Sequence, residues 1–208
     1  MIRALAMLSL LCLDGCVTSP ASTWQSLFSK ASLAPWTPVI FGGDGTIHMQ
    51  DGAMILEAGS PLTGVIAAPN LPREYELRLR AVRLQGNDFF CGLTFPVRGS
   101  HLTLVLGGWG GAVCGLSNLD DMDAAHNDTR RLRHFNNGVP VQVVLRVSDD
   151  RVEVDLDDKE FLRVPLADRT LLLRAEMRLC QPLGFASFAT RSALLACDFR
   201  PLSSKNYQ

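Results

Sequence analysis

The sequence predicts an all-β protein built as an antiparallel sandwich or barrel. About a dozen short apolar runs are separated by turn-forming residues roughly every 8 to 15 positions, a rhythm typical of such folds. Several runs alternate strictly between apolar and charged residues, and no long helical period follows residue 35. The 208 residues suit one domain with a short appendage and are enough to bury a sizeable core.

The clearest expected strand covers residues 74–81. Its odd-numbered positions are apolar and its even-numbered positions are Glu or Arg, so the two sets point to opposite faces of a sheet. Residues 151–157 alternate in the same way, and Asp157-Asp158 is expected to form the hairpin turn that follows. Charged residues at alternate positions predict a partly solvated sheet face with Glu–Arg pairs between strands.

The remaining strands follow from shorter apolar runs bounded by turn residues. They are expected at residues 141–147, 161–166, 171–178, 185–190 and 194–199. The chain-breaking clusters between strands contain Gly, Asn, Asp or Pro, residues that favour turns. These clusters are at residues 42–45, 51–52, 69–70, 86–88 and 136–138.

The N-terminus has the pattern of an export signal. Arg3 supplies the positive charge and residues 4–13 form an apolar run too short to span a bilayer. The following Leu13-Asp14-Gly15-Cys16 resembles a bacterial lipobox, which implies a lipoprotein-type signal peptide over residues 1–15 and lipidation of Cys16. Asp14 departs from that pattern, where a small or apolar residue is usual. A plain secretory signal cleaved near Ala21 is the alternative.

The domain organisation follows from this signal. Residues 16–35 are expected to be a tether, residues 36–202 the β-sandwich domain, and residues 203–208 a C-terminal tail. The protein is therefore expected to be exported to the cell envelope and held by lipid in the periplasm or on the outer membrane. Its contact with the membrane would be through the lipid anchor alone.

Charge and hydrophobicity exclude two further classes of protein. The 20 basic residues balance 21 acidic residues, so no basic excess exists to meet a phosphate backbone, and we expect no nucleic-acid partner. The 47% hydrophobic content is too high, and the net charge of −1 too low, for an intrinsically disordered chain.

Four cysteines follow the expected signal: Cys91, Cys114, Cys180 and Cys197. Two interpretations are open. An exported chain can form disulfides, and pairs of Cys91 with Cys114 and of Cys180 with Cys197 would join segments near in sequence. Alternatively, all four are buried free thiols that behave as small hydrophobic side chains.

The densest cluster of unusual residues runs from Asn87 to Thr129. Four glycines surround Trp109, which suggests either a close approach of a sugar ring that stacks on this indole or a buried tryptophan packed against glycines. A polar loop follows, and its side chains could line a ligand or divalent-cation pocket. The alternative is a loop held by Asx-type bonds from side chain to backbone. The sequence leaves the metal undecided.

A second acidic row is Glu153, Asp155 and Asp157. These residues share one strand face, and i, i+2 neighbours lie about 7 Å apart, a separation that a carboxylate pair of a glycosidase can use. Since Asp157 begins the expected hairpin turn, we interpret the row as a solvated face.

Four segments carry a resemblance to a known family. They are DFFCGLTFPV (88–97), GGWGG (107–111), GLSxxDxxDAxxNxT (115–129) and PLGxAxFxT (182–190). In these segments the chain resembles the bacterial 3-keto-disaccharide hydrolase-like domains, over about residues 36–202. The resemblance implies a concanavalin-like lectin/glucanase sandwich, or jelly roll, and an exported protein with a carbohydrate ligand.

For the hydrolytic members, the resemblance implies elimination chemistry on a sugar oxidised at C3. A base removes the C2 proton, the glycosidic oxygen leaves, and water adds. Asp120, Asp123 or His126 would be the base. The expected substrate-binding residues are Arg83, Asp88, Trp109, Asn127 and Thr129.

The alternative is a non-catalytic carbohydrate-binding or structural β-sandwich of the envelope, because this fold serves lectins as well as glycosidases. A compact pocket that joins Asp120, Asp123 and His126 to an arginine would favour the enzyme. An exposed aromatic platform without that cluster would favour the binding protein.

Overall fold

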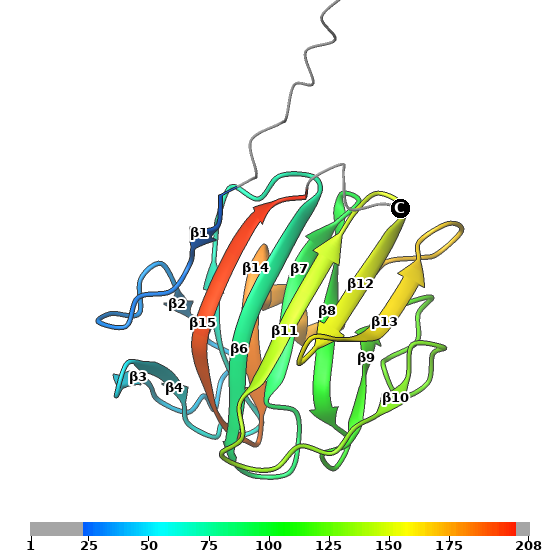
Figure 1. Ribbon diagram of the computed structural model, residues 1–208. Coiled ribbons are helices and arrows are strands. Elements are labelled where there is room, and N and C mark those ends of the chain that lie inside the picture. Colours follow the sequence, from blue (N-terminus) through cyan, green and yellow to red (C-terminus); the bar gives the residue numbers. More distant parts are fainter. Residues whose placement is uncertain (1–22, 203–208) are drawn as a thin grey trace, which may run out of the picture.

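Strands that alternate apolar and charged residues build the first of two antiparallel sheets, sheet A. The computed structural model describes residues 23–202. Strand order in sheet A is β13-β12-β11-β6-β15-β4-β3, with β1 paired to β15 (Figure 1). The strands are β1 (Gln25–Ser26), β3 (Ile47–Gln50), β4 (Ala53–Leu56), β6 (Tyr75–Gln85), β11 (Val141–Val147), β12 (Arg151–Leu156), β13 (Lys159–Pro165) and β15 (Arg191–Pro201).

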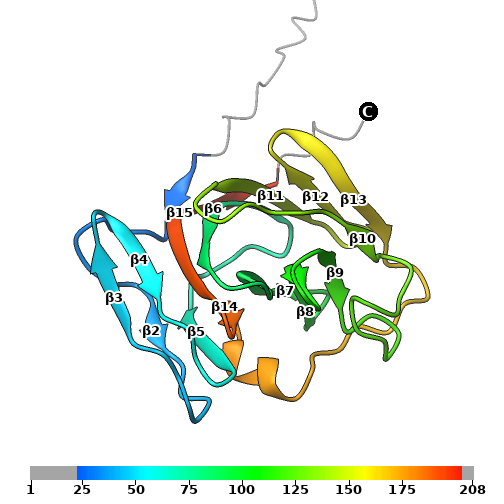
Figure 2. The same cartoon turned by 90° about the horizontal axis from the view of Figure 1, so that it is seen from below.

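The second sheet, sheet B, is built from more uniformly apolar strands. Its order is β10-β9-β8-β7-β14-β5-β2, again antiparallel. The strands are β2 (Thr37–Pro38), β5 (Leu62–Ala67), β7 (Cys91–Val97), β8 (Ser100–Gly108), β9 (Val113–Ser117), β10 (Arg131–Leu132) and β14 (Leu183–Phe188). The 3-10 helix η1 (Glu176–Cys180) lies on the side of sheet B away from sheet A (Figure 2).

The core lies between the sheets. Leu77 and Leu79 of β6 face Leu104 and Leu106 of β8 in one continuous cluster of buried side chains. These four side chains are at most 2% exposed, as the alternation in residues 74–81 predicts. The predicted antiparallel β-sandwich is confirmed, and the turn at Asp157-Asp158 is present with positive φ at both residues.

The outer face of sheet A is a lattice of ion pairs. Glu76 of β6 is only 5% exposed, and it pairs with Arg146 of β11 at 3.3 Å and with Arg200 of β15 at 2.5 Å. Arg78 pairs with Asp198 at 3.0 Å. The expected Glu–Arg pairing between strands is thus confirmed.

The acidic row of β12 belongs to the same lattice. Glu153 pairs with Arg151 at 3.0 Å, and Asp155 with Arg146 at 2.7 Å. Asp157 pairs with Arg133. Each of these carboxylates has a cationic partner and none is buried, in agreement with the interpretation of the row as a solvated face.

One expected strand is wrong. Within residues 171–178, Leu171 forms an isolated bridge with Leu119, and η1 begins at Glu176. Leu171 and Leu173 are half-buried against the apolar clusters, whereas Leu172 is exposed. Leu171 and Leu173 pack against the sandwich from outside its named strands, so their apolar character reflects packing and not strand pairing.

The sandwich also begins earlier than the expected boundary at residue 36. Strand β1 lies inside the expected tether (16–35), Leu27 is buried, and the ring of Trp24 lies 4.2 Å and 4.4 Å from the guanidinium carbons of Arg78 and Arg200. The expected signal peptide (1–15), the lipidation at Cys16 and the tail (203–208) lie outside the described residues. No helix among residues 23–202 is long and apolar enough to cross a bilayer.

The four cysteines within the described chain are free and buried, so the disulfide interpretation is wrong and the alternative is confirmed. Burial raises the pKa of the Cys114 thiol to about 11 and that of Cys180 to about 12. Burial also raises the pKa values of Cys91 and Cys197. The neighbouring Cys114 thiol adds to the shift of Cys91, and Asp198 and Cys91 add to that of Cys197.

Candidate functional site

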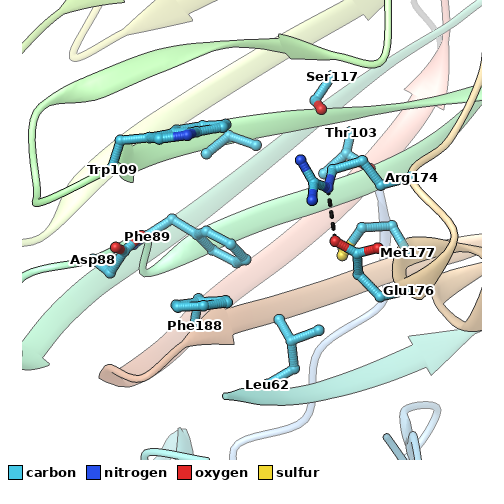
Figure 3. Close-up of a pocket in the computed structure, with 11 residues that line it drawn as sticks. Leu62, Asp88, Phe89, Thr103, Trp109, Ser117, Arg174, Glu176, Met177 and Phe188 are labelled. Carbon is cyan, nitrogen blue, oxygen red and sulfur yellow. Dashed lines mark hydrogen bonds and ion pairs between the residues drawn. The ribbon is translucent and has the colours of Figure 1, made fainter. Parts of the chain in front are cut away.

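A cavity of about 210 Å³ opens on the outer face of sheet B. Strand β8 determines which side chains reach it: Leu102, Leu104 and Leu106 point into the core, so Thr103 and Val105 point outward. The rest of the apolar wall comes from four other segments of the chain. It consists of Leu62 of β5, Phe89 before β7, Phe188 of β14 and Met177 of η1 (Figure 3).

Two phenylalanines form the base of this wall. The rings of Phe89 and Phe188 have centroids 5.7 Å apart and planes inclined by 42°. Gly92 makes room for Phe89, since a Cβ on Gly92 would come within 2.9 Å of that ring. An apolar wall of this kind can accept the hydrophobic face of a ring-shaped ligand.

Trp109 lies at the mouth of the cavity and is 43% exposed. It belongs to the tight β8–β9 turn, in which Gly111 N–H donates to the Gly108 carbonyl at 3.2 Å. Trp109 and Gly110 both have positive φ, 50° and 87°, as the central residues of a type I′ hairpin turn do. The buried-tryptophan interpretation is wrong, because this indole is accessible and faces the cavity (Figure 3).

Asp88 fixes this turn from the opposite loop. Its Oδ1 accepts from Phe89 N–H at 2.7 Å, and its Oδ2 accepts from Gly110 N–H at 3.4 Å. Its own N–H donates to Thr190 Oγ1 at 3.1 Å. Asp88 therefore lines the cavity and also ties the Trp109 turn to the loop before β7.

The polar end of the cavity comes from the segment before η1. Arg174 Nε donates to Glu176 Oε1 at 2.7 Å, and both side chains line the cavity beside Thr103 and Ser117 (Figure 3). Arg174 Nη1 also lies 3.5 Å from Asp123 Oδ2. Arg174 is thereby held between two carboxylates.

A second cavity, of about 270 Å³, adjoins the first at this ion pair. Its lining combines Arg174, Ala175 and Glu176 with residues of the polar loop. The residues from that loop are Asn118, Asp121 and Asp123. Asp123 therefore lines the second cavity and pairs with Arg174, which lines both cavities.

Asp120 and His126 line neither cavity. Asp120 accepts from Thr170 N–H at 2.8 Å and pairs with Arg169 at 2.7 Å. His126 Nδ1 lies 2.6 Å from Asp123 Oδ1, with 72% of its side chain exposed. The three expected base candidates do not converge on one pocket with an arginine.

Asn127 and Thr129 are buried and hold the polar loop against β9. Asn127 Nδ2 donates to the carbonyls of Leu116 at 2.8 Å and Met122 at 3.0 Å. Its Oδ1 accepts from Thr129 N–H and Thr129 Oγ1, and Thr129 Oγ1 in turn accepts from Leu116 N–H. The alternative of a loop held by Asx-type bonds describes these two residues.

Arg83 lies behind the Trp109 turn and lines neither cavity. It is 7% exposed, and its Nε donates to Asn137 Oδ1 at 2.9 Å while Nη2 donates to the Phe135 carbonyl. Burial lowers the pKa of this guanidinium, and the nearby Asp88 carboxylate opposes the shift. A Cβ on Gly111 would meet Arg83 Nη1 at 3.1 Å, so Arg83 supports the turn from below.

Among residues 23–202, no group of three or more His, Cys, Asp or Glu side chains gathers as the ligands of a metal ion would. Asp120, Asp123 and Asp128 of the polar loop are instead partnered with arginines, with His126 or with backbone N–H groups.

Of the predicted site residues, the structure brings Asp88 and Trp109 to the first cavity and Asp123 to the second. Sequence reasoning missed Arg174, Glu176 and Met177, because it assigned their segment to a strand. Phe89 and Phe188 lay within quoted motifs, but no local pattern distinguishes an aromatic residue on the outer face from one in the core.

Comparison with known proteins supports the fold. No protein-family model matches this chain, and no curated protein sequence matches it either. A Bacillus subtilis protein of unknown function with a galectin-like fold is similar, with a TM-score of 0.61 at 12% identity, over 87% of this chain and 96% of that one.

Two further solved structures have recorded carbohydrate roles. The carbohydrate-binding module CBM66 from Bacillus subtilis gives a TM-score of 0.54 at 9% identity, covering 79% of this chain and 94% of that one. Domain 4 of an extracellular arabinanase from Geobacillus stearothermophilus, solved with arabinotriose, gives 0.52 at 13% identity, covering 86% and 93%. At these identities the likeness establishes a galectin-like, concanavalin-like β-sandwich.

Proposed function

We propose that this protein binds carbohydrate in the cavity on the outer face of sheet B, with Trp109 as the stacking platform. The observation that carries the proposal is the exposed indole at the mouth of a cavity walled by Phe89 and Phe188. Sugars present an apolar face and a rim of hydroxyls, and this cavity offers aromatic rings beside Asp88, Arg174 and Glu176.

Two further observations support binding. Trp109 has a φ of 50°, and a bulky residue adopts such a backbone only where its surroundings hold it there. Asp88 and Arg83 support its turn from two sides, so the platform is rigid before the ligand arrives. The carbohydrate roles of the arabinanase domain and the CBM66 module agree with a sugar ligand.

Hydrolysis of 3-keto-glycosides is the second candidate. It is favoured by Glu176, a carboxylate that lines the cavity and could remove the C2 proton of a bound keto sugar. Against it, Asp120 and His126 lie outside the cavity, and Glu176 is already paired with Arg174. Binding therefore accounts for more of the geometry than catalysis does.

The test is titration of the purified protein with a panel of neutral oligosaccharides, followed by calorimetry and tryptophan fluorescence. We expect Trp109→Ala to weaken binding at least about ten-fold, the effect of losing a central aromatic contact. Trp24→Ala is the matched control, because Trp24 packs between arginines on the outer face of sheet A. Equal affinities of the two variants would contradict the proposed site.

The same samples decide the second candidate. Incubation with 3-keto-glucosides and their unoxidised parents, with and without a divalent cation, would reveal release of the aglycone. Release from the keto form alone, abolished by Glu176→Gln, would replace binding by the elimination reaction.

We also propose that the protein is exported and carries lipid on Cys16. The sequence of residues 1–16 is the support for this, and the sandwich itself agrees with either a soluble or an anchored form. Metabolic labelling with a fatty acid, compared between the native chain and Cys16→Ser, tests it; equal labelling would contradict lipidation.

A further inference from the structure

The two cavities of sheet B adjoin and share the pair Arg174–Glu176. The first holds the aromatic platform, and the second is lined by polar or charged residues apart from Ala175. A ligand that stacks on Trp109 and extends past this pair enters the second cavity directly. Trp109 lines the first cavity and Asp121 the second, so a chain of sugar units that contacts both residues would occupy both cavities.

Charge distinguishes these cavities from the balanced lattice of sheet A. The charged residues that line them are Asp88, Asp121, Asp123, Glu176 and Arg174. Four carboxylates thus face a single guanidinium. Arg174 is held by Glu176 at 2.7 Å and by Asp123 at 3.5 Å, so its charge is neutralised from within the protein.

An anionic ligand would therefore meet an excess of carboxylates over cationic side chains in the lining of the site. Asp88 lies at the platform end, and Asp121 is exposed at the far end and lines the second cavity. Like charges brought together in a partly enclosed site repel, and no further cationic side chain lines either cavity to offset the repulsion.

We propose that the site selects an uncharged oligosaccharide of more than one sugar unit and rejects acidic chains such as polyuronates. This inference rests on the proposed carbohydrate-binding function and names its ligand class. Asp121 is the residue that determines rejection at the second cavity, and Arg174 with Glu176 forms the contact shared by both cavities.

The test compares matched probes that differ in charge. Cellotriose is compared with its 6-carboxylate form, and trigalacturonate with its methyl ester, by calorimetry at low salt; glucose serves as the short probe. We expect each neutral trimer that binds to have an affinity at least about ten-fold higher than that of its anionic partner. We expect its affinity to exceed that of the monosaccharide by a similar factor. Because salt screens charge repulsion, raising the salt concentration should reduce the ratio of neutral-trimer to anionic-trimer affinity. The ratio of trimer to monosaccharide affinity should stay unchanged.

Asp121→Asn tests the assigned residue. The residue is exposed with a φ of 61°, a conformation that Asn adopts readily, so the fold should be unaffected. We expect the affinity for the anionic trimers to rise about two- to three-fold relative to the affinity for the neutral trimers. Asp51→Asn is the matched control, because Asp51 is also exposed with a positive φ of 51° and lines neither cavity.

Three outcomes would overturn the inference. Anionic trimers that bind as tightly as neutral ones would show that charge does not select the ligand. A monosaccharide that binds as tightly as the trimer would show that the second cavity is not used. If no probe binds and Trp109 fluorescence never changes, the proposed function fails as well, which separates that result from the first two.

Discussion

At Trp109 a single side chain combines an accessible aromatic face with a constrained backbone. The turn places the indole at the cavity, Asp88 accepts a hydrogen bond from Gly110 N–H, and Arg83 lies beneath Gly111. The neighbouring polar loop uses the same kinds of residue differently. There Asn127 and Thr129 form their hydrogen bonds within the protein. Side-chain identity alone therefore does not separate a binding residue from a structural one.

Replacing Asn127 by Ala should destabilise the fold by about 1–3 kcal/mol. The substitution leaves the carbonyls of Leu116 and Met122 and the N–H of Thr129 without their partner in a buried position. The free energy of unfolding from urea denaturation measures this. Asn70→Ala, at an exposed position, should change it by less than about 0.5 kcal/mol. Equal effects would show that the Asn127 contacts do not stabilise the loop.

At the scale of single elements, η1 and the segment before it determine the site. This segment covers the outer face of sheet B and contributes Arg174, Glu176 and Met177 to the first cavity. It approaches the sheet closely at Gly184 of β14. A Cβ at Gly184 would lie 2.5 Å from the Cys180 carbonyl oxygen, so only glycine permits this contact.

Gly184→Ala should therefore displace η1. The loss in the free energy of ligand binding should exceed the loss in the free energy of unfolding. The clash is with backbone atoms of Cys180, which a rotation of a side chain cannot relieve. Calorimetric affinity and the thermal midpoint measure the two effects. Gly64→Ala is a milder comparison, since its nearest neighbours are the side chains of Ala186 and Phe41 at 3.0 and 3.1 Å. Unaltered affinity in Gly184→Ala would show that the position of η1 does not determine the site.

Considered as a whole molecule, the two sheets have different outer faces. Sheet A carries paired charges such as Arg146–Glu76 and Arg146–Asp155, which satisfy one another and leave few groups for a ligand. Sheet B carries an aromatic cavity on its outer face and is partly covered by η1. Between them the continuous core buries free thiols as well as aliphatic and aromatic side chains.

Three of the four thiols, Cys91, Cys114 and Cys197, belong to this core, and Cys180 belongs to the cluster between η1 and sheet B. Cys91, Cys114, Cys180 and Cys197 should resist alkylation at pH 8 in the native state and react together on unfolding. They are buried, and burial raises their pKa values, so the reactive thiolate is scarce as well as inaccessible. Mass spectrometry of the peptides, at increasing urea concentration, measures each site. Early modification of Cys180 alone would reveal that η1 opens before the sandwich unfolds.

The sequence predicts the class of fold and most of the strands from local pattern alone. Period-two alternation is a local pattern, so the alternation in residues 74–81 predicts which face of the strand is buried without knowledge of the partner strands. It also determined the hairpin turns, because Gly, Asn and Asp tolerate positive φ wherever they occur. The four glycines of the GGWGG motif likewise indicate an unusual backbone around Trp109 from the sequence alone.

Which polar residues form the site depends on contacts between segments that are distant in sequence. Asp123 lies next to Arg174 because the segment after β13 folds back across sheet B, a contact between residues about fifty positions apart that no local pattern encodes. The error at residues 171–178 has the same cause. Leucines that pack onto a sheet and leucines that pair within it look alike in sequence, since both bury apolar area. Whether such a segment adds a strand to a sheet or forms the wall of a cavity depends on which part of the folded sandwich it packs against.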